Sequence, residues 1–536
     1  MLFWARMNVQ KVDNWKFSFK RFPFLLKIYL DKSRRIAIKK SAQMGLTVWE
    51  MLDSFHKAWT GLNHIIFFPT TRLVTKFVQG RYNTLVGRNP KLQAIIKDGG
   101  GDTDNSTMKN LGKGLVYFSG LGAATKEGGQ FDVISVPADG VSFDEVEKMH
   151  PKKVKLARRD RLAASPYKYE RYLSTPGLPD YGIDAIHKET NQQVWMIKCT
   201  HCGREAYVQD DQKMAFPACI EPGYLRCWKC GLKLDPLNGR WVALYPDIKD
   251  FSGYHVSRLY DPSVDYVQTL KDYRECTSTT QLKDFHNGFR GETYLDNSQR
   301  VTAAQILRLC QNRPMLTKAP PGMKCSAGVD IGGQRKGIHC VISSPGKWKL
   351  RDIQWLGIIR DPGMGSELDL DFLFRDFVIR FGAFNVRKFA VDFAPETRVS
   401  RALVNRFKGK GWMCRYSAHQ KKAYLWTEEP AGNVVEVNRT ESLDHSHYLL
   451  EKGLISLPRQ CPDVETFAAH CEHVVREVEE DPETGAREAT WKKIGDDDYR
   501  HAFNYDAVCW YDGSRSHQKP EGSFQVPGNI RKELGL

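Results

Sequence analysis

The feature that most constrains the fold is a short polar loop in front of a helical pattern. The loop runs Ala37-Ile38-Lys39-Lys40-Ser41-Ala42-Gln43-Met44-Gly45-Leu46-Thr47 and comes after an apolar run from Phe22 to Leu30. We expect a helix from Val48 to Lys57 directly after it. A strand, a tight loop and a helix N-terminus together direct backbone N–H groups and the positive end of the helix at one anion. The stretch therefore predicts a phosphate-binding loop.

This loop departs from the usual pattern of phosphate-binding loops. Against G-x-x-x-x-G-K-[ST], Gly45 and Thr47 are in register, but Leu46 stands at the lysine position and Lys40 at the first glycine position. On its own, the stretch is better explained as a basic turn before an ordinary helix. The choice between the two depends on motifs further along the chain.

An α/β sheet is predicted from the segments after the loop. Apolar strands are expected at His64–Phe68, Leu115–Phe118 and Gly140–Phe143, with a helix from Leu73 to about Val86. Alternating strands and helices are typical of a parallel sheet.

Polar residues come after two of the predicted strands. Asp144 and Glu145 lie directly after Gly140–Phe143, where an aspartate can hold Mg²⁺ and a glutamate can polarise the attacking water. Acidic pairs at strand ends also occur for purely structural reasons. Ser174-Thr175-Pro176 ends a further strand, at the place where motor ATPases carry a polar residue that senses the γ-phosphate.

A cysteine cluster gives the most specific chemical signal. Two C-x-x-C-G motifs, at Cys199/Cys202 and Cys227/Cys230, each aim two thiolates at one point. Four thiolates make a closed tetrahedral Zn²⁺ site, which predicts a structural zinc ribbon. Redox use of a single C-x-x-C is the alternative, and Cys219 and His201 are not expected to be ligands.

Composition limits the class of protein. The chain has 536 residues, 41% hydrophobic and 26% charged, and a net charge of +16, which together favour a folded protein with a polyanionic partner. The longest apolar run is too short for a membrane span, no cleavable signal is recognised, and the 13 cysteines are too scattered for a disulfide framework. We therefore expect an intracellular protein.

Three acidic positions mark a second strand-rich region. Asp330 lies in the strand Ser326–Ile331 and is followed by glycines, and Asp392 lies in the strand Lys388–Phe393. Asp497 and Asp498 begin a later helix, with His501 and Asp506 as further candidates in it. Carboxylates on neighbouring elements can hold two divalent ions for phosphodiester cleavage, although the Asp-x-Gly turn also occurs in actin-like and sugar-kinase folds.

Together these motifs resemble the large terminase subunit of lambda-type tailed phages, which packages DNA into preformed heads. The resemblance covers roughly residues 35 to 510 and is carried by motifs in a fixed order: Lys40 to Thr47, Phe67-Phe68-Pro69-Thr70, Phe143 to Glu147, Leu173 to Gly177 and the cysteine ribbon. In that family the loop lysine can lie early, at the position of Lys40.

The resemblance implies roles for these residues. Lys40 would reach the phosphates, with Lys39 as the alternative, and Thr47 and Asp144 would bind Mg²⁺. Glu145 would be the catalytic base, and Ser174 and Thr175 would couple hydrolysis to movement. The ATP-binding residues would be Lys40, Ser41, Ala42, Gln43, Met44, Gly45, Leu46, Thr47 and Asp144. An arginine finger is sought among Arg158, Arg159, Arg161, Arg35 and Arg72, with a solvated or DNA-facing helix as the simpler explanation of the basic run at 152–161.

The expected fold class is α/β, with an ATPase domain on a parallel sheet, an inserted zinc ribbon and an RNase H-like nuclease domain. The expected boundaries are an N-terminal arm at 1–34, the ATPase domain at 35–190, the zinc ribbon at 191–241, an ATPase subdomain or connector at 242–312, a linker at 313–323, the nuclease domain at 324–513 and a flexible tail at 514–536.

The resemblance also implies cofactors, partners and a location. ATP with Mg²⁺, two Mg²⁺ or Mn²⁺ ions at the nuclease site and one structural Zn²⁺ are expected. The expected partners are double-stranded DNA, the small terminase subunit, the portal protein and further copies of the chain on the portal, and no membrane is expected. The expected location is the host cytoplasm and, transiently, the procapsid. The protein is not expected in the mature virion. The alternatives are a zinc-ribbon helicase or translocase without nuclease activity, and a zinc scaffold that has lost ATPase function.

Overall fold

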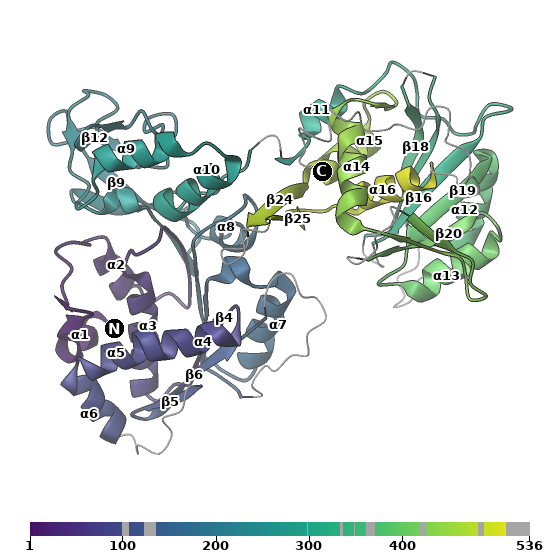
Figure 1. Ribbon diagram of the computed structural model, residues 1–536. Coiled ribbons are helices and arrows are strands. Elements are labelled where there is room, and N and C mark those ends of the chain that lie inside the picture. The colour runs from purple at the N-terminus through teal and green to yellow at the C-terminus, as the bar shows by residue number, and fades with distance from the viewer. Residues whose placement is uncertain are drawn as a thin grey trace. The chain divides into compact units, whose positions relative to one another are not determined.

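The computed structural model describes residues 1–98, 107–122, 136–296, 299–332, 336–347, 349–360, 370–417, 424–480 and 487–510. The chain forms two compact units, Met1–Leu295 and Asp296–Leu536 (Figure 1). The predicted tail at 514–536 lies outside the described residues.

The first unit is built on a ten-stranded sheet in the described part of the chain. Its order is β10-β9-β15-β3-β8-β7-β4-β6-β5, and β14 pairs with β9. The strands from β9 to β6 in this order are parallel to their neighbours, and β5, β10 and β14 are antiparallel additions. The bounds are β3 Arg35–Lys40, β4 His64–Phe68, β5 Met108–Leu111, β6 Gly114–Gly120, β7 Gly140–Asp144, β8 Tyr169–Ser174, β9 Gln193–Lys198, β10 Glu205–Ala206, β14 Gly239–Ala243 and β15 Phe251–Val256. The predicted α/β class is confirmed.

Helices cover both faces of this sheet, as alternation along β3 illustrates. Ile36 and Ile38 pack into the core that contains α3, while Ala37 packs into the core that contains α7 and α8. Because successive side chains point to opposite faces, β3 is buried on both faces of the sheet. The helices are α3 Leu46–Trp59, α4 Thr71–Phe77, η1 Val78–Tyr82, α5 Asn83–Gly87, α6 Pro90–Asp98, η2 Val146–Lys148, α7 Pro151–Arg161 and α8 Gly182–Lys188.

The N-terminal segment is part of the first unit. It contains α1 Leu2–Asn8, β1 Lys11–Val12, β2 Trp15–Lys16 and α2 Leu25–Leu30. Trp4, Phe24 and Ile28 are buried in the same core as α3, and Trp241 donates its indole N–H to Phe24 O at 2.8 Å. The predicted arm therefore packs against the sheet. The apolar run before the loop forms a helix, and the strand that leads into the loop is β3.

A small cysteine-bearing lobe comes after β9. Its short strands β11 Ile220–Glu221, β12 Tyr224–Arg226 and β13 Lys233–Leu234 form a separate three-stranded sheet in the described residues. The chain then returns to the main sheet through β14 and β15. It continues into η3 Arg258–Tyr260, α9 Tyr266–Glu275, α10 Thr279–Phe285 and η4 His286–Arg290.

The second unit is built on an eight-stranded sheet among its described residues, in the order β21-β22-β20-β19-β16-β17-β18-β23. β16, β17 and β18 form an antiparallel meander, while β19 and β20 continue parallel to β16 on its other side. The bounds are β16 Cys325–Ile331, β17 Ile338–Pro345, β18 Arg351–Ile359, β19 Val386–Asp392, β20 Gly411–Tyr416, β21 Tyr424–Thr427, β22 Val434–Val437 and β23 Ile455–Ser456.

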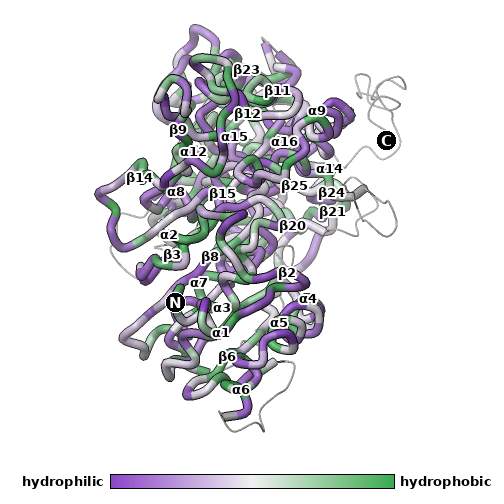
Figure 2. The backbone as a smooth tube through the Cα atoms, turned by 90° about the vertical axis from the view of Figure 1, so that its left-hand side faces the viewer, coloured by the Kyte–Doolittle hydropathy of each residue, from purple (hydrophilic) through white to green (hydrophobic). Residues whose placement is uncertain are grey.

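Helix α16 crosses this sheet at close range. An added Cβ at Gly328 of β16 would lie 1.9 Å from Ala502 O of α16, so the glycine is required by the packing. The helices of this unit are α11 Ala303–Leu307, α12 Leu370–Ala383, α13 Thr397–Arg406, α14 Arg439–Glu451, α15 Pro462–Glu472 and α16 Asp498–Cys509; β24 Val474–Glu480 and β25 Arg487–Lys493 form a hairpin. Apolar and polar stretches alternate along the chain within each unit (Figure 2).

The boundary between the units differs from the predicted one. The second unit begins at Asp296, so residues 296–323 lie within it. Arg313, at the start of the predicted linker, donates to Ile353 O at 2.8 Å, and Leu316 and Met323 pack against the core of this unit. The prolines of this segment therefore shape a packed turn. No helix in the described part of the chain is both long and apolar enough to cross a membrane.

Candidate functional site

The predicted phosphate loop lies between β3 and α3. Gln43 and Gly45 have φ angles of 61° and 76°, so the loop turns twice through the left-handed region before α3 begins at Leu46. The first N–H groups of a helix have no acceptor within it. The loop and the start of α3 therefore provide the N–H groups that an anion requires.

The two adjacent lysines of β3 have different partners. Lys40 is buried, with its Nζ 3.6 Å from Glu145 Oε1, and Lys39 binds Asp184 Oδ1 of α8 at 2.9 Å. Neighbouring residues of a strand project to opposite faces. Lys40 is thus the lysine that faces the acidic pair, as the resemblance implies, while Lys39 is held by α8.

The departure at Leu46 has a packing explanation. Leu46 is 1% exposed and lies in the core around α3, together with Met44 and Trp49. A charged side chain there would have to be buried among apolar neighbours. The positive charge is instead supplied by Lys40 from the end of β3.

Asp144 and Glu145 end β7 beside this loop. Asp144 is 5% exposed, and its Oδ1 has no hydrogen-bond partner among the described residues. Burial raises the pKa of Asp144 to about 6, with Lys40 opposing this shift and Glu145 adding to it. Glu145 has φ 60° and ψ 45°, which is rare for a residue with a side chain and is typical of functional positions. The orphaned carboxylate oxygen fits a cation ligand.

A further carboxylate, which the sequence motifs did not indicate, lies in the same region. Glu50 of α3 is fully buried, and neither of its carboxylate oxygens has a partner among the described residues. Burial raises its pKa well above the usual value, Asp144 adds to the shift and Lys40 opposes it. Glu50 comes three positions after Thr47, so both side chains lie on one face of the helix.

The Ser174 turn is joined to the acidic segment by hydrogen bonds. The backbone N–H of Glu147 donates to Ser174 Oγ at 3.3 Å, and the carboxylate of Glu147 accepts from Leu178 N at 3.4 Å and Ile183 N at 3.1 Å. The segment after β7 and the turn after β8 are therefore held together. This contact suits the coupling role predicted for Ser174 and Thr175.

The back of the phosphate loop is covered by a segment near residue 290, which no sequence motif indicated. Ala42 N donates to Gly288 O at 2.9 Å, and Ser41 N donates to Val256 O at 2.8 Å. An added Cβ at Gly291 would lie 2.7 Å from Ser41 N. The only local sign in the sequence is the glycine pair Gly288 and Gly291.

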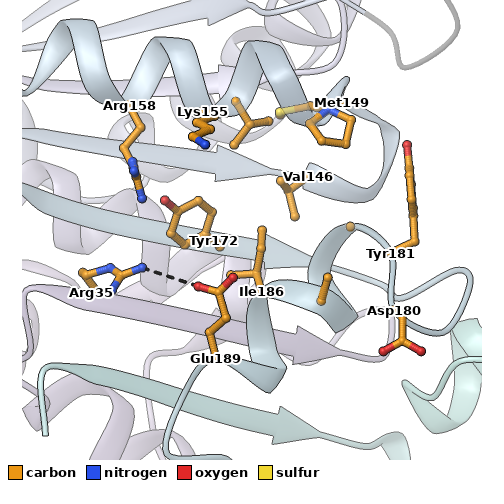
Figure 3. Close-up of a pocket in the computed structure, with 14 residues that line it drawn as sticks. Arg35, Val146, Met149, Lys155, Arg158, Tyr172, Asp180, Tyr181, Ile186 and Glu189 are labelled. Atoms are coloured by element: carbon orange, nitrogen blue, oxygen red, sulfur yellow. Dashed lines mark ion pairs between the residues drawn. The ribbon is translucent and has the colours of Figure 1, made fainter. Parts of the chain in front are cut away.

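A separate cavity of about 470 Å³ lies between α7 and α8 (Figure 3). Among the residues that line it, Arg158 projects from α7 toward Tyr172 and Arg35 faces Glu189 at 4.0 Å. Both arginines also approach Glu170, at 3.2 Å from Arg35 and 3.8 Å from Arg158. Two of the arginine-finger candidates are thus engaged within the unit, and Arg159 pairs with Asp160 at 2.7 Å.

The four predicted zinc ligands converge. Their Sγ atoms all lie within 4.8 Å of one another, with Cys199 to Cys230 at 3.8 Å and Cys202 to Cys227 at 3.7 Å. Both knuckles have the same backbone: Gly203 N and Gly231 N donate to the carbonyl of the first cysteine at 3.0 Å. Each of these glycines has a positive φ, 71° and 74°, where the chain turns around the sulfurs.

In the second unit, Asp330 and Asp392 lie at the carboxyl ends of adjacent parallel strands, β16 and β19. Asp392 Oδ1 accepts from Ile331 N at 3.0 Å. Burial raises the pKa of Asp392 to about 8, and desolvation followed by the charges of Asp392 and Asp498 raises the pKa of Asp330 well above its usual value. Two carboxylates that repel each other when both are ionised are suited to sharing a cation.

The residues at the start of α16 divide by role. Asp498 Oδ1 would be 2.9 Å from a Cβ at Gly332, so it approaches the turn after Asp330 directly. Asp497 instead pairs with Lys493 and with His501 Nε2 at 3.4 Å; burial opposes ionisation there, but His501 and Lys493 outweigh it and lower the pKa.

Asp506 lies between α16 and the sheet, where Ser326 of β16 and Ser343 of β17 each donate to it at 2.5 Å. Its contacts are thus with the two strands under α16. Of the candidates in α16, Asp498 has the most direct approach to Asp330.

Asp498 belongs to a tight group of potential metal ligands that does not include the predicted carboxylates Asp330 and Asp392. Apart from the cysteines, one group of potential metal-ligand atoms within 4.8 Å of one another is found in the described residues: His339, His470 and Asp498. Neither histidine was singled out from the sequence, because each stands alone and they are separated by more than a hundred positions.

The fold and the loop geometry define the first unit as a nucleotide-binding α/β domain of the phosphate-loop class. Residues 17–242 match the family model described as the ATPase domain of the phage terminase large subunit gpA. This segment is therefore similar to a terminase large-subunit ATPase domain, in agreement with the resemblance predicted from the sequence.

Solved structures with a similar chain were also found. The large terminase of bacteriophage HK97 has 13% identity and a TM-score of 0.47, and the match covers 88% of this chain and 90% of that chain. The large terminase of a thermophilic bacteriophage, in complex with ADP, has 12% identity and a TM-score of 0.30 over 90% of this chain and 96% of that chain. The ATPase domain of the Thermus phage P74-26 large terminase has 13% identity and a TM-score of 0.29 over 50% and 91%. No curated protein matches the chain.

Proposed function

We propose that this chain is a terminase large subunit that drives double-stranded DNA into a procapsid with ATP and cuts concatemeric DNA at a metal-dependent nuclease site. The observation that carries the proposal is the combination, in one chain, of a matched terminase ATPase domain with a second unit that pairs Asp330 and Asp392 on adjacent strand ends. The charge of +16 suits a partner that is bound through its phosphates.

In the proposed ATPase, the phosphates lie against the N–H groups of the loop and the start of α3. Lys40 neutralises charge on the transferred phosphoryl group, and Glu145 orients the attacking water and accepts its proton. Thr47 and Asp144 hold Mg²⁺, which when bound neutralises phosphate charge. The buried, unpartnered Oδ1 of Asp144 supports that assignment. Ser174 and Thr175 report the phosphate state to the rest of the unit through Glu147.

In the proposed nuclease, the strand order of the second unit supports an RNase H-like fold: an antiparallel meander, β16 to β18, extended by parallel strands β19 and β20 beside β16. Asp330, Asp392 and Asp498 would hold two Mg²⁺ or Mn²⁺ ions, which activate water and stabilise the leaving oxygen. Asp497 is the weaker candidate because it already pairs with Lys493 and lies 3.4 Å from His501 Nε2.

A structural Zn²⁺ is proposed for the cysteine lobe. The four Sγ atoms already lie at mutual distances that suit one tetrahedral ion, and both glycine turns are formed. Such a closed site binds no substrate. Its role is to hold the lobe together.

The proposed partners are double-stranded DNA, the small terminase subunit, the portal protein and further copies of the chain on the portal. The proposed location is the host cytoplasm, with transient residence on the procapsid and none in the mature virion. The alternative, a zinc-ribbon helicase without nuclease activity, predicts no metal-dependent cutting.

One experiment separates these functions. ATP turnover and plasmid cutting in Mg²⁺ or Mn²⁺ are measured for the wild type, Glu145→Gln and Asp330→Asn. We expect Glu145→Gln to lose hydrolysis and keep cutting, and Asp330→Asn to do the reverse. Cutting that survives in Asp330→Asn would refute the nuclease assignment, and hydrolysis that survives in Glu145→Gln would refute the ATPase assignment.

A further inference from the structure

The group of His339, His470 and Asp498 has the composition of a metal site. One ring nitrogen of each histidine and one carboxylate oxygen lie within 4.8 Å of one another, and all three residues are buried. We propose that these residues bind a divalent transition-metal ion of the Mn²⁺ or Zn²⁺ class, at a position beside Asp330 and Asp392. The proposal deepens the proposed nuclease function, because it names the kind of ion that this centre takes.

Three elements bring the ligands together. His339 of β17 is the register partner of Asp330 on β16, and such partners in an antiparallel pair project from the same face. His470 comes from α15, and Asp498 is the first residue of α16. Because β16 lies between β17 and β19, Asp330 lies between His339 and Asp392 along the edge of the sheet. Asp498 can therefore serve both the histidine pair and the carboxylate pair.

Both imidazoles have a ring nitrogen that can bind a metal. His339 is 3% exposed, and its Nδ1 has no hydrogen-bond partner among the described residues. A neutral imidazole keeps a lone pair for coordination. His470 Nδ1 accepts a long hydrogen bond from Tyr499 N, at 3.2 Å, which an ion at that nitrogen would replace.

A cationic side chain already lies at the carboxylate of this group. Lys336 Nζ is 3.2 Å from Asp498 Oδ2 and 2.6 Å from Asp496 Oδ1, and its side chain is 39% exposed. The ammonium therefore neutralises Asp498 from the solvent side. Lys336 can move to Asp496 alone and leave Asp498 to an ion.

Aromatic packing is the simpler explanation of the two histidines. The His339 ring meets Tyr499 edge to face at 4.7 Å and lies 5.4 Å from the His470 ring. Packing accounts for burial, but a nonpolar side chain would pack there without an orphaned nitrogen. It also does not account for the convergence of both rings on one carboxylate.

The ligand set indicates which ion is bound. Imidazole favours transition metals, whereas Mg²⁺ is held by carboxylates, carbonyls and water. Three protein ligands leave coordination positions for water or a phosphate oxygen. We therefore expect Mn²⁺ or Zn²⁺ here, and Mg²⁺ only at the carboxylates.

The test is electron paramagnetic resonance with Mn²⁺ on the full chain without nucleotide, supplied with one equivalent of Zn²⁺ so that only the four-cysteine site is filled. Spin-echo modulation by ¹⁴N reports imidazole coordination directly. We expect nitrogen modulation in the wild type that a roughly hundredfold excess of Mg²⁺ does not remove. His470→Asn and His339→Asn are each expected to weaken this Mn²⁺ site by at least about 10-fold. His447→Asn, which removes a histidine that packs on Trp491 in the same unit, is the control and should bind like the wild type.

The outcomes separate this site from the nuclease. Bound Mn²⁺ without nitrogen modulation, or Mg²⁺ displacing it at equal concentration, would overturn the metal site even if the protein cuts DNA. Nitrogen-coupled Mn²⁺ that persists in Asp330→Asn supports the site. If it is found in a wild-type protein that does not cut DNA, the site stands and the nuclease function is refuted.

Discussion

At the scale of single residues, the choice between two adjacent lysines defines the nucleotide site. Lys39 and Lys40 differ by one position in β3, which turns one toward Asp184 and the other toward Glu145. A motif cannot make this choice, because both residues are lysines at plausible spacing. The alternation of side chains along the strand decides between them, since only one of the two lysines can share a face with the end of β7.

Lys40→Ala is expected to reduce ATP hydrolysis by a factor on the order of 10²–10³, because a preorganised charge at the transferred group is lost. Lys39→Ala is the matched control. Its loss leaves Asp184, whose side chain is 4% exposed, with Lys188 as its remaining cation at 3.2 Å. We expect it to lower the free energy of unfolding by about 1–3 kcal/mol and to change hydrolysis little. Steady-state hydrolysis and urea unfolding of both variants measure this; equal loss of hydrolysis would contradict the assignment.

Glu292 is expected to make stability depend on pH. Burial raises its pKa to about 7, although Arg290 at 2.7 Å opposes the shift, and Asp211 and Lys39 are the other charges that act on it. Because the folded pKa lies above the unfolded one, the folded state keeps a proton that the unfolded state releases. The stabilisation is complete below the unfolded pKa of about 4.3 and is lost as the pH rises to about 7, with a slope of up to about 1.4 kcal/mol per pH unit.

Thermal unfolding of the wild type and Glu292→Gln between pH 4.5 and 8 measures this effect. The amide cannot ionise, so the variant should lose less stability across that window than the wild type. Parallel profiles for the two proteins would show that Glu292 titrates normally.

At the scale of elements, the phosphate loop depends on a distant segment. Gly291 comes directly after η4, has a φ of 69°, and lies against the backbone of Ser41 and Lys40. A side chain there would meet Ser41 N at 2.7 Å and Lys40 C at 3.0 Å. The loop geometry is therefore fixed from both sides: by α3 in front and by the segment from His286 to Gly291 behind.

Gly291→Ala is expected to weaken ATP binding and to lower the free energy of unfolding by about 1–3 kcal/mol, because it strains the backbone and displaces the loop. Gly288→Ala is the control. No heavy atom of the described structure lies within 4 Å of its added Cβ, and its carbonyl still accepts from Ala42 N. Nucleotide titration and thermal unfolding compare the two variants. Similar affinities would show that this segment does not shape the loop.

Much of the element order could be predicted from the sequence. The buried strands β4, β7, β16 and β19 were predicted to within about two residues because their apolar runs are short and bounded by polar turns. Phe22–Leu30 was wrongly taken as the strand before the loop and contains helix α2, since a short apolar run fits a strand or a helix equally well. β3 carries polar residues at both ends, which hides it from a search for apolar runs.

The site residues that sequence reasoning missed are those without a local pattern. Glu50 is an ordinary helix residue until its burial beside Asp144 is known. His339 and His470 meet only because β17 and α15 are brought to the start of α16. In contrast, the cysteines repeat one motif twice, so their meeting could be predicted.

At the scale of the whole molecule, a proline-rich segment was a poor guide to the boundary between the units. The proline-rich residues 313–323 were predicted to separate the domains, yet they pack within the second unit. Prolines mark where a chain turns, and a turn can be packed or exposed. An inference from net charge does not depend on the boundary, because the charge acts on a polyanion wherever the boundary lies.

The excess of 79 Lys and Arg over 63 Asp and Glu predicts how the proposed translocase binds DNA. A translocase must hold every sequence that passes through it, so its contacts are to phosphates, and each neutralised phosphate releases counterions. We expect two unrelated duplexes to bind with affinities within about threefold of each other, and log K to fall linearly with log salt at a slope of about −0.9 per phosphate contact. Fluorescence anisotropy without added divalent ions, where no metal-dependent cutting is expected and the proposed zinc site stays filled, measures both. A slope near zero, or strong preference for one duplex, would mean that recognition depends on base contacts and that the net charge serves another purpose.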